Sequence, residues 1–361
     1  MAMKGEVVYL YAFDVANEII LSAARDIVSG SPMSLTLHSK RTLPKDVSLY
    51  KPYAVSLSSL DKRLQGREVY PTMHIYEVGV ISIVMRVPFE VKHLHELLPM
   101  HTPMLGDGKA LGQAAYDLCA KTCAQLGAAL KQPTALHEPE AYTVFCLTDI
   151  GTDKKLETWM ENNRRNIAEL ITENTSGILS EMQVQEVLRI HRSYANTDLA
   201  IIDWDAALIV DLAGYVEDTL YVLELANLQL EEYKVMDRRL DIYLDTAYED
   251  IQSRRFHFFG TYSAILRRLR TLRVDVTKLH DEVTHITKFF GDWYLARVYM
   301  GARERFHLGQ WRNSVEERLR QIDALYSVAH TEMTNQRMLW LELLVVILFV
   351  IDIAGLFLFK Y

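Results

Sequence analysis

Four residues in the segment KHLHELLPMH have side chains that commonly bind metal ions, namely His93, His95, Glu96 and His101. Imidazole and carboxylate groups are ordinary ligands of zinc and related metals. His93 and His95 are two positions apart, and on a helix this spacing directs them to different faces. A helical turn that faces solvent is therefore the favoured interpretation, with a metal site as the alternative.

Two further features have residue types that could carry chemistry. A glycine-rich run at residues 106–112 precedes a predicted helix, whose N-terminus could hold a phosphate, but the run lacks the lysine spacing of a P-loop. Cys119 and Cys123 are four positions apart and could share a ligand, although buried thiols are commoner in an alanine-rich helix. Because no serine, cysteine or carboxylate pair falls in a recognisable catalytic motif, we expect a protein that is not an enzyme and uses no cofactor.

The densest basic run is ILRRLRTLR, which contains Arg267, Arg268, Arg270 and Arg273. One interpretation is a solvated helix face that pairs with surrounding Asp and Glu residues. The other is a contact patch for the head groups of anionic lipids or the phosphates of RNA. The formal net charge of −8 disfavours a protein that coats nucleic acid. We expect membrane lipid and a protein or ribonucleoprotein as partners, and no DNA.

Residues 338–359 read MLWLELLVVILFVIDIAGLFLF, a run of 22 residues interrupted by only two acids. At about 1.5 Å per residue, a helix of this length covers the roughly 30 Å hydrocarbon core of a bilayer, whereas a buried core helix is the alternative. Trp340 at one end, and Lys360 with Tyr361 at the other, are residue types that anchor a span at the interface. More arginines precede the span than basic residues follow it, so a tail anchor with its N-terminal part in the cytoplasm is predicted.

The two acids in this span are Glu342 and Asp352. A carboxylate in hydrocarbon is costly unless it is protonated, paired or lifted to the interface. Glu342 lies near the head of the span, within reach of water, whereas Asp352 lies deeper. At about 100° per residue, ten positions separate the two by roughly 80° around the helix, so one face could turn both toward a partner. This arrangement favours self-association and therefore a homo-oligomer.

The spacing of apolar residues divides the chain into three parts. Before residue 214, strands are predicted at 6–15, 53–60 and 142–148, paired strands at 69–88 turning near Gly79, and helices at about 16–27, 109–131 and 155–173. Residues 198–211 form either two short strands or one buried element. Long helices at about 223–247, 262–290 and 293–308 follow, and residues 311–359 could form one continuous helix with coiled-coil-like spacing.

The predicted fold class is therefore α+β. It comprises an N-terminal α/β sandwich-type domain at residues 1–213, a helical stalk of antiparallel long helices at residues 214–337, and a single transmembrane helix at residues 338–359. Three cysteines are too few for a disulfide framework, which fits a reducing compartment. The first residues carry acids where a secretory signal needs an apolar run, so we expect the N-terminus to be structural.

The stretch from about residue 292 to 352 resembles the C-terminal end of the required-for-meiotic-nuclear-division (RMD/YagE-type) family. It has an aromatic-rich turn, the pair Val298-Tyr299, the sequence EERL at 316–319, and an aliphatic run in which Glu342 and Asp352 match two acids of that family. The resemblance implies an α/β domain, a helical stalk, a C-terminal anchor and a role related to translation. The missing transit peptide favours a bacterial owner, with the protein a single-pass component of the inner (plasma) membrane.

Together these features predict a non-enzymatic, homo-oligomeric scaffold that is tethered to a membrane and presents a cytoplasmic domain to a macromolecular partner. The alternative is an ion-channel or metal-sensing assembly in which several copies bring Asp352 together. That layout is similar to the CorA-type magnesium channels in architecture only, because those have two spans and a Gly-Met-Asn motif that this chain lacks.

Overall fold

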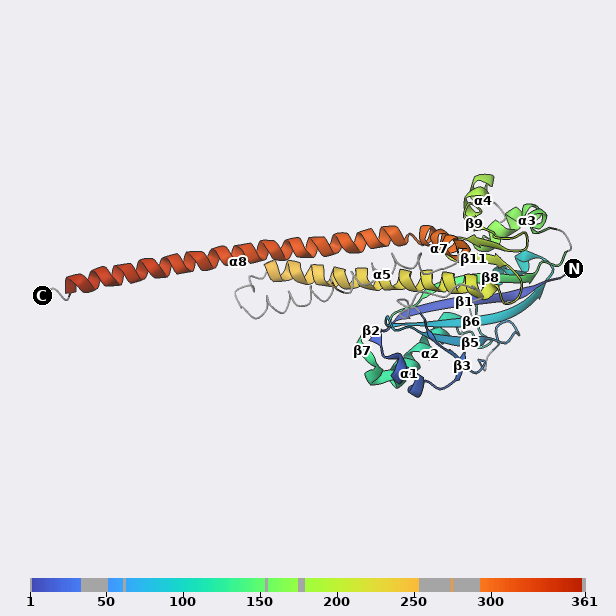
Figure 1. Cartoon of the computed structure of the whole chain (residues 1–361), viewed down its shortest axis with the longest axis horizontal. Coiled ribbons are helices and arrows are strands. Elements are labelled where there is room, and N and C mark those ends of the chain that lie inside the picture. Colours follow the sequence, from blue (N-terminus) through green and yellow to red (C-terminus); the bar gives the residue numbers. More distant parts are fainter. Residues whose placement is uncertain are drawn as a thin grey trace. The chain divides into compact units, whose positions relative to one another are not determined.

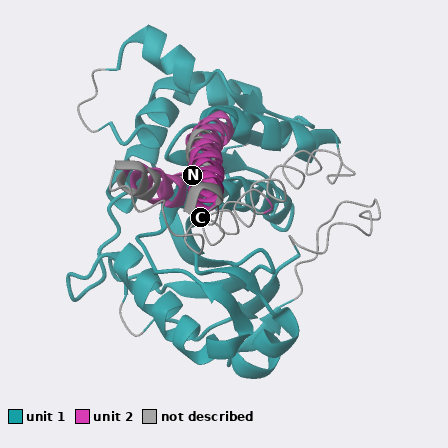
Figure 2. Ribbon diagram, turned by 90° about the vertical axis from the view of Figure 1, so that its left-hand side faces the viewer, with its two compact units in different colours: residues 1–235, 282–311 teal, residues 236–281, 312–361 magenta. Residues whose placement is uncertain are grey.

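The computed structural model of the chain describes residues 2–33, 51–60, 63–152, 155–174, 179–252, 274 and 293–358. The chain divides into two compact units (Figure 2), the first formed by residues 1–235 with 282–311 and the second by residues 236–281 with 312–361. Two long helices, α5 (Val216–Gln252) and α8 (Leu308–Leu358), contribute residues to both units.

The first unit is built on a nine-stranded sheet (Figure 1). Its strand order is β3 (Ser31–Met33), β4 (Tyr53–Ser56), β5 (Tyr70–Ile75), β6 (Val80–Val91), β1 (Met3–Asp14), β8 (Glu140–Asp149), β11 (Ala206–Val210), β10 (Leu199–Ile202) and β9 (His191–Arg192). Neighbouring strands are antiparallel, except that β8 and β11 run parallel. A separate two-stranded sheet pairs β2 (Ala16–Ile19) with β7 (Leu130–Pro133).

The central strand β1 shows why this sheet forms. Its middle, VVYLYAF, consists mostly of β-branched and aromatic residues, which favour extended backbone. All seven of these residues are buried, because protein covers both faces of the sheet. A strand buried on both faces reads as a continuous apolar run without polar alternation.

One face of the sheet carries the main hydrophobic core, to which Tyr9, Phe13 and Phe145 contribute. The short helices and 3-10 segments that pack on this face are α1 (Leu21–Ile27), η2 (Leu94–Met100), α2 (Leu111–Leu126), η3 (Gly127–Ala129), α3 (Leu156–Ile171) and α4 (Glu181–Val187). In α3 the buried residues recur at helical spacing, so one stripe of the helix meets the core while the opposite stripe is polar.

The opposite face packs against the first half of α5 and against α7 (Trp293–Arg305). Asn227 Nδ2 on α5 donates to the Glu140 carbonyl oxygen at 3.1 Å, and the ring of Phe306 meets the ring of Tyr142 at 4.8 Å. Between residues 219 and 230 every residue of α5 is buried. This part of α5 is therefore a core helix, which explains its lack of a polar face.

In the second unit, α5 and α8 run in the same direction. Ser314 Oγ donates to Asp237 at 3.3 Å, and Arg318, one turn further along α8, pairs with Asp237 at 2.8 Å and with Asp241. The contacts advance together along both helices, as a parallel pair requires. The predicted helix at residues 262–290 lies, except for Val274, outside the described residues.

The expected single helix at residues 311–359 corresponds to α8, which is continuous over 51 residues or about 75 Å. Its start differs from expectation, because the preceding helix ends at Arg305 and not at Gly309. His307 breaks the chain path with a left-handed φ of 51°, and Gly309 already lies within α8. The two helices are therefore separated at His307, although histidine is not a typical helix-breaking residue.

The mixed α+β class with a large N-terminal sheet is confirmed. The structure also confirms the paired strands turning at Gly79, and residues 198–211 form two strands, β10 and β11. The expected helix at 16–27 is wrong in its first turn, since Ala16–Ile19 forms β2. Val15 N donates to the Gly79 carbonyl at 2.9 Å and Ile19 N to the Glu77 carbonyl at 3.0 Å. These long-range bonds keep the segment extended despite its helical periodicity.

Candidate functional site

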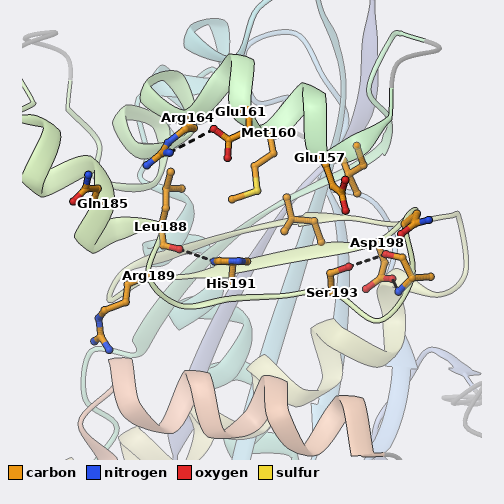
Figure 3. A pocket seen from close by; sticks show the side chains of 14 residues that line it. Glu157, Met160, Glu161, Arg164, Gln185, Leu188, Arg189, His191, Ser193 and Asp198 are labelled. Atoms are coloured by element: carbon orange, nitrogen blue, oxygen red, sulfur yellow. Dashed lines mark hydrogen bonds and ion pairs between the residues drawn. The ribbon is translucent and has the colours of Figure 1, made fainter.

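A cavity of about 670 Å³ lies between α3, the C-terminal end of α4 and the loop that joins β9 to β10 (Figure 3). Its floor is apolar, formed by Leu156, Met160, Leu188 and Leu199. Polar side chains surround this floor, namely those of Glu157, Glu161, Arg164, Gln185, Arg189, His191, Ser193, Asn196 and Asp198. An apolar base with polar groups around it is the usual architecture of a site for a small molecule.

The two arginines of this cavity are paired with glutamates, only one of which lines the cavity. Arg164 Nη1 lies 3.4 Å from Glu161, and Arg189 lies 3.1 Å from Glu186 and 2.8 Å from Glu304. Hydrogen bonds from Arg189 and Arg305 hold the pKa of Glu186 below its ordinary value. Arg164 Nε is buried and has no hydrogen-bond partner in the described part of the chain.

His191, Ser193 and Asp198 are the residue types of a hydrolytic triad, and all three line the cavity (Figure 3). Each is instead engaged with backbone. His191 Nδ1 donates to the Leu188 carbonyl at 2.8 Å, Ser193 Oγ donates to the Ala195 carbonyl at 2.7 Å, and Asp198 accepts the amide of Tyr194 at 2.8 Å. A nucleophile needs a base within hydrogen-bond reach, and in the described residues no such bond joins these three. The arrangement suits binding better than acyl transfer.

The apolar end of α8 is the second candidate site. Met338–Gly355 has a mean hydropathy of 2.4, none of it is buried, and among the described residues it is the one stretch long and apolar enough to cross a membrane. Trp340 is 71% exposed, and Glu342 and Asp352 are both exposed within the stretch. The expected anchors Lys360 and Tyr361 lie outside the described residues, as do Arg267, Arg268, Arg270 and Arg273 of the basic run.

The structure brings His93 and His95 together but leaves His101 apart. His93 is extended (φ −135°, ψ 145°) and precedes η2, so helical spacing does not apply, and the two rings stack with centroids 5.4 Å apart. His101 Nε2 donates to the Leu170 carbonyl at 2.6 Å, and burial lowers the pKa of His101. No three His, Cys, Asp or Glu side chains within the described ranges are placed to hold a metal ion.

The other two motifs are used structurally. In the glycine-rich run, Gly106 N donates to the Arg63 carbonyl at 3.0 Å and Gly108 N to the Leu105 carbonyl at 2.8 Å, so these amides already have partners. Cys119 is buried and Cys123 half-buried on α2. A hydrogen bond to Cys123, together with burial, raises the pKa of the Cys119 thiol well above its ordinary value, as expected of an unreactive thiol.

Sequence reasoning missed the polar groups that join the sheet to α5, of which His74 and Glu224 are buried and Arg86, Glu6 and Glu217 are partly exposed. His74 Nδ1 lies 2.8 Å from Glu224, and Arg86 makes a bidentate contact with Glu217 at 2.7 Å while also bonding Glu6 at 2.8 Å. The sequence signal that could have revealed these groups is a histidine in one mostly apolar strand, β5, and an arginine in another, β6. Their partners lie 150 and 131 residues away, so spacing alone does not connect them.

Comparison with known proteins identifies one family. A family model described as "Uncharacterized protein MJ0711, N-terminal domain" matches residues 4–216. "Uncharacterized protein MJ0711" of Methanocaldococcus jannaschii is 22% identical over 295 residues, which cover 82% of this chain and 84% of that protein. No solved structure matches the chain significantly.

These matches overturn two expectations. The resemblance to the RMD/YagE-type family is wrong, because the matching family is a different one and its model covers the residues that build the sheet. The resemblance rested on a short aliphatic run with two acids, and an apolar run of this kind indicates a membrane-spanning helix without identifying a family. The expectation of a bacterial inner-membrane protein is also wrong, since the named relative comes from an archaeon.

Proposed function

This chain belongs to the MJ0711 N-terminal domain family, and we propose that it is a non-enzymatic scaffold anchored in a membrane by the apolar part of α8. In this proposal α8 is a stalk that tethers the sheet-bearing unit to the bilayer. Copies of the chain associate, and the tethered unit holds a protein or ribonucleoprotein partner.

The observation that carries the proposal is the exposure of Met338–Gly355. Phe349 is 68% exposed and Ile351 is 61% exposed, on a stretch of helix that is apolar except for Glu342 and Asp352. A helix of this kind is stable in hydrocarbon, whereas water disfavours so large an apolar surface. Its backbone donors and acceptors are satisfied within the helix, as the interior of a bilayer requires.

The first unit supports a binding role over a catalytic one. The cavity beside α3 contains a serine, a histidine and an aspartate, yet each of them is bonded to backbone as set out above. Its arginines are paired with glutamates. A cavity with an apolar floor and polar groups around it is suited to recognition.

The test is membrane attachment of the full-length protein. Expressed in cells, it should sediment with membranes and resist extraction by alkaline carbonate. The double variant Leu344→Lys/Leu348→Lys places two charges in the middle of the span, each costing about 2.5–3.5 kcal/mol there. We expect this variant to be released into the soluble fraction.

The matched control is Met182→Lys/Met300→Lys, which places two lysines at positions that are 82% and 52% exposed in the first unit. It should stay in the membrane fraction like the unmodified chain. Extraction of the full-length protein by carbonate, or equal release of the control, would contradict the anchor. Affinity purification of the unmodified full-length protein and of the Leu344→Lys/Leu348→Lys variant should enrich different partners. Identical partners would contradict the tethering role.

An ion-conducting assembly is the second candidate, and the observation that favours it is Asp352 inside the apolar stretch. A carboxylate in a span most often serves a partner contact or an ion path. Liposomes containing the protein should then leak cations, and Asp352→Asn should stop the flux. Flux that is absent, or is unchanged by Asp352→Asn, would exclude this candidate.

A further inference from the structure

A second cavity of the first unit, of about 280 Å³, lies where three strands end beside α3. Because β1 is antiparallel to β6 and β8, the start of β1 lies beside the ends of those two strands. The floor is apolar and includes Met3, Leu94 and Trp159, of which Trp159 is only 5% exposed. The remaining lining residues are Lys92, His93, His95, Ile150, Thr152, Asn162, Asn163 and Asn166.

The polar lining of this cavity has an unusual charge. It includes one lysine and two histidines, and no carboxylate is among its described lining residues. Lys92 forms no ion pair with a described residue. In a chain with a formal net charge of −8, a cavity lined by cationic and amide groups differs from the rest of the surface. The larger cavity, by contrast, has three carboxylates in its lining.

The turn before η2 places both histidines at the mouth of the cavity. Glu96 accepts the amide of Lys92 at 3.0 Å and the amide of His93 at 2.8 Å. These bonds fix the turn, and the two imidazole rings stack with 16° between their planes. The hydrogen bond from the His93 amide, the largest cause, lowers the pKa of Glu96, so this carboxylate remains an ionised acceptor for the turn. Both rings stay solvent-accessible.

Three asparagines of α3 form the opposite wall. Asn162, Asn163 and Asn166 fall within one and a half turns of the helix, on the side of Trp159. Asparagine is a poor helix former, so three in one helix interior run against local propensity. Asn163 Nδ2 donates to the Trp159 carbonyl at 2.8 Å, which is a structural bond. Neither Asn162 nor Asn166 forms a side-chain hydrogen bond with a described residue, and residues that break local rules often serve a site.

We propose that this cavity binds a phosphate group, either as inorganic phosphate or as part of a phosphorylated small molecule. Lys92 supplies charge, the two histidines supply ring N–H donors, and the amides of Asn162 and Asn166 donate from the facing wall. Lysine and amide donors are common partners of phosphate oxygens, whereas a metal cation would meet Lys92 and no carboxylate. The apolar floor with Trp159 accommodates the organic part of a phosphorylated ligand.

The experiment measures phosphate binding to the full-length protein in a neutral detergent by isothermal titration calorimetry, in a buffer free of other oxyanions. Inorganic phosphate should bind saturably at one site per chain. Asn166→Asp replaces an exposed amide by a carboxylate of nearly equal size, and we expect it to weaken binding at least tenfold. Lys92→Ala should weaken binding to a similar extent, and both variants should keep the unfolding temperature of the unmodified chain.

Lys121→Ala is the matched control, because Lys121 is an exposed lysine on α2 that lines neither cavity. It should bind phosphate like the unmodified protein. Glycerol phosphate, which has the phosphate of a lipid head group, distinguishes the source of the ligand: tighter binding than inorganic phosphate favours an organic phosphate, and equal binding favours the free ion. Absence of saturable binding, or equal weakening in all three variants, would overturn the site. These results do not depend on membrane attachment.

Discussion

His74 on β5 and Glu224 on α5 form a pair in which both side chains are buried. His74 Nδ1 lies 2.8 Å and 3.0 Å from the two carboxylate oxygens of Glu224. The side chains are 6% and 5% exposed. Burial alone would raise the pKa of Glu224, but the attraction of His74 and its hydrogen bond to the carboxylate outweigh it, so the pKa of Glu224 is lowered. The pair joins the sheet to its central covering helix.

Removing one member of this pair should destabilise the first unit strongly. Glu224→Gln removes the carboxylate that the buried His74 ring contacts, and breaking a buried pair costs about 3–5 kcal/mol. The double variant His74→Leu/Glu224→Leu should recover most of that loss, because neither buried polar partner is then left without the other. Chemical denaturation of the three proteins measures both effects. Glu90→Gln, which breaks an exposed pair with Lys4, is the control and should cost no more than about 1 kcal/mol.

The same pair gives a pH dependence whose sign follows from Glu224. Because the folded state lowers the pKa of this carboxyl below its ordinary 4.5, its contribution to stability is complete above about pH 4.5. The contribution is lost as the pH falls through the folded value. Unfolding free energies measured between pH 7 and pH 3 should therefore fall less steeply for the His74→Leu/Glu224→Leu variant than for the unmodified chain. Parallel curves would contradict this assignment.

Asp211 at the end of β11 should give the opposite pH dependence. Burial, with the charges of Asp198 and Asp218, raises the pKa of Asp211 from 3.8 to about 6. The folded protein holds this proton more tightly than the unfolded chain, so the stabilisation is present below about pH 4 and is lost as the pH rises to about 6. Asp211→Asn removes the charge that is disfavoured at neutral pH.

Asp211→Asn should therefore raise stability at pH 7 by about 1 kcal/mol, a value reduced because the group is half exposed to solvent. Its amide oxygen can still accept the Leu212 N–H, which lies 2.7 Å from Asp211 Oδ1. At pH 4 the variant and the unmodified chain should be equally stable. Thermal unfolding at both pH values measures the difference, and Asp26→Asn, an exposed change on α1, should alter neither value.

Gly79 lies at the turn between β5 and β6, where a side chain has no room. A Cβ atom there would be 1.8 Å from the Ala16 carbonyl oxygen, and the φ of +95° is left-handed. Gly79→Ala should therefore cost about 3 kcal/mol or more, because backbone must move. Gly66→Ala is the matched control: its φ is +80°, but nothing lies within 4 Å, so only the strain of about 1–2 kcal/mol applies. Equal costs in denaturant titrations would refute the steric explanation.

How much of the fold the sequence predicts depends on how local each signal is. The turn at Gly79, the strand VVYLYAF and the helix that becomes α3 are correct because glycine, β-branched residues and helical periodicity act over a few residues. The error at Ala16–Ile19 has the opposite cause, since bonds to Glu77 and Gly79, some 60 residues away, decide the backbone. The break in the helix at His307 also coincides with a long-range contact, because the ring of His307 lies 4.7 Å from the ring of Trp204, which is distant in the sequence.

The candidate sites follow the same rule. The apolar stretch of α8 is visible in the sequence because hydropathy is a local property. The stacking of His93 and His95 was missed because helical geometry was assumed for a residue that is extended. The opposite wall of that cavity, Asn162 and Asn166, lies about 70 residues further along the chain, so no spacing argument could have joined the two halves.

Asp352 should promote association between copies of the chain, whereas Glu342 should not. Glu342 is the fifth residue of the predicted span and can reach the interface, whereas Asp352 is ten residues further along and has seven residues of the span after it. A polar group at that depth is most stable when another helix supplies a hydrogen-bond partner. Asp352→Leu should therefore reduce the oligomeric fraction in native mass spectra of protein extracted in mild detergent, by severalfold for an interaction of about 1 kcal/mol.

Glu342→Leu is the matched control and should leave the oligomeric fraction unchanged, while both variants remain in the membrane. A spectrum that shows only monomer for the unmodified chain would contradict self-association through α8.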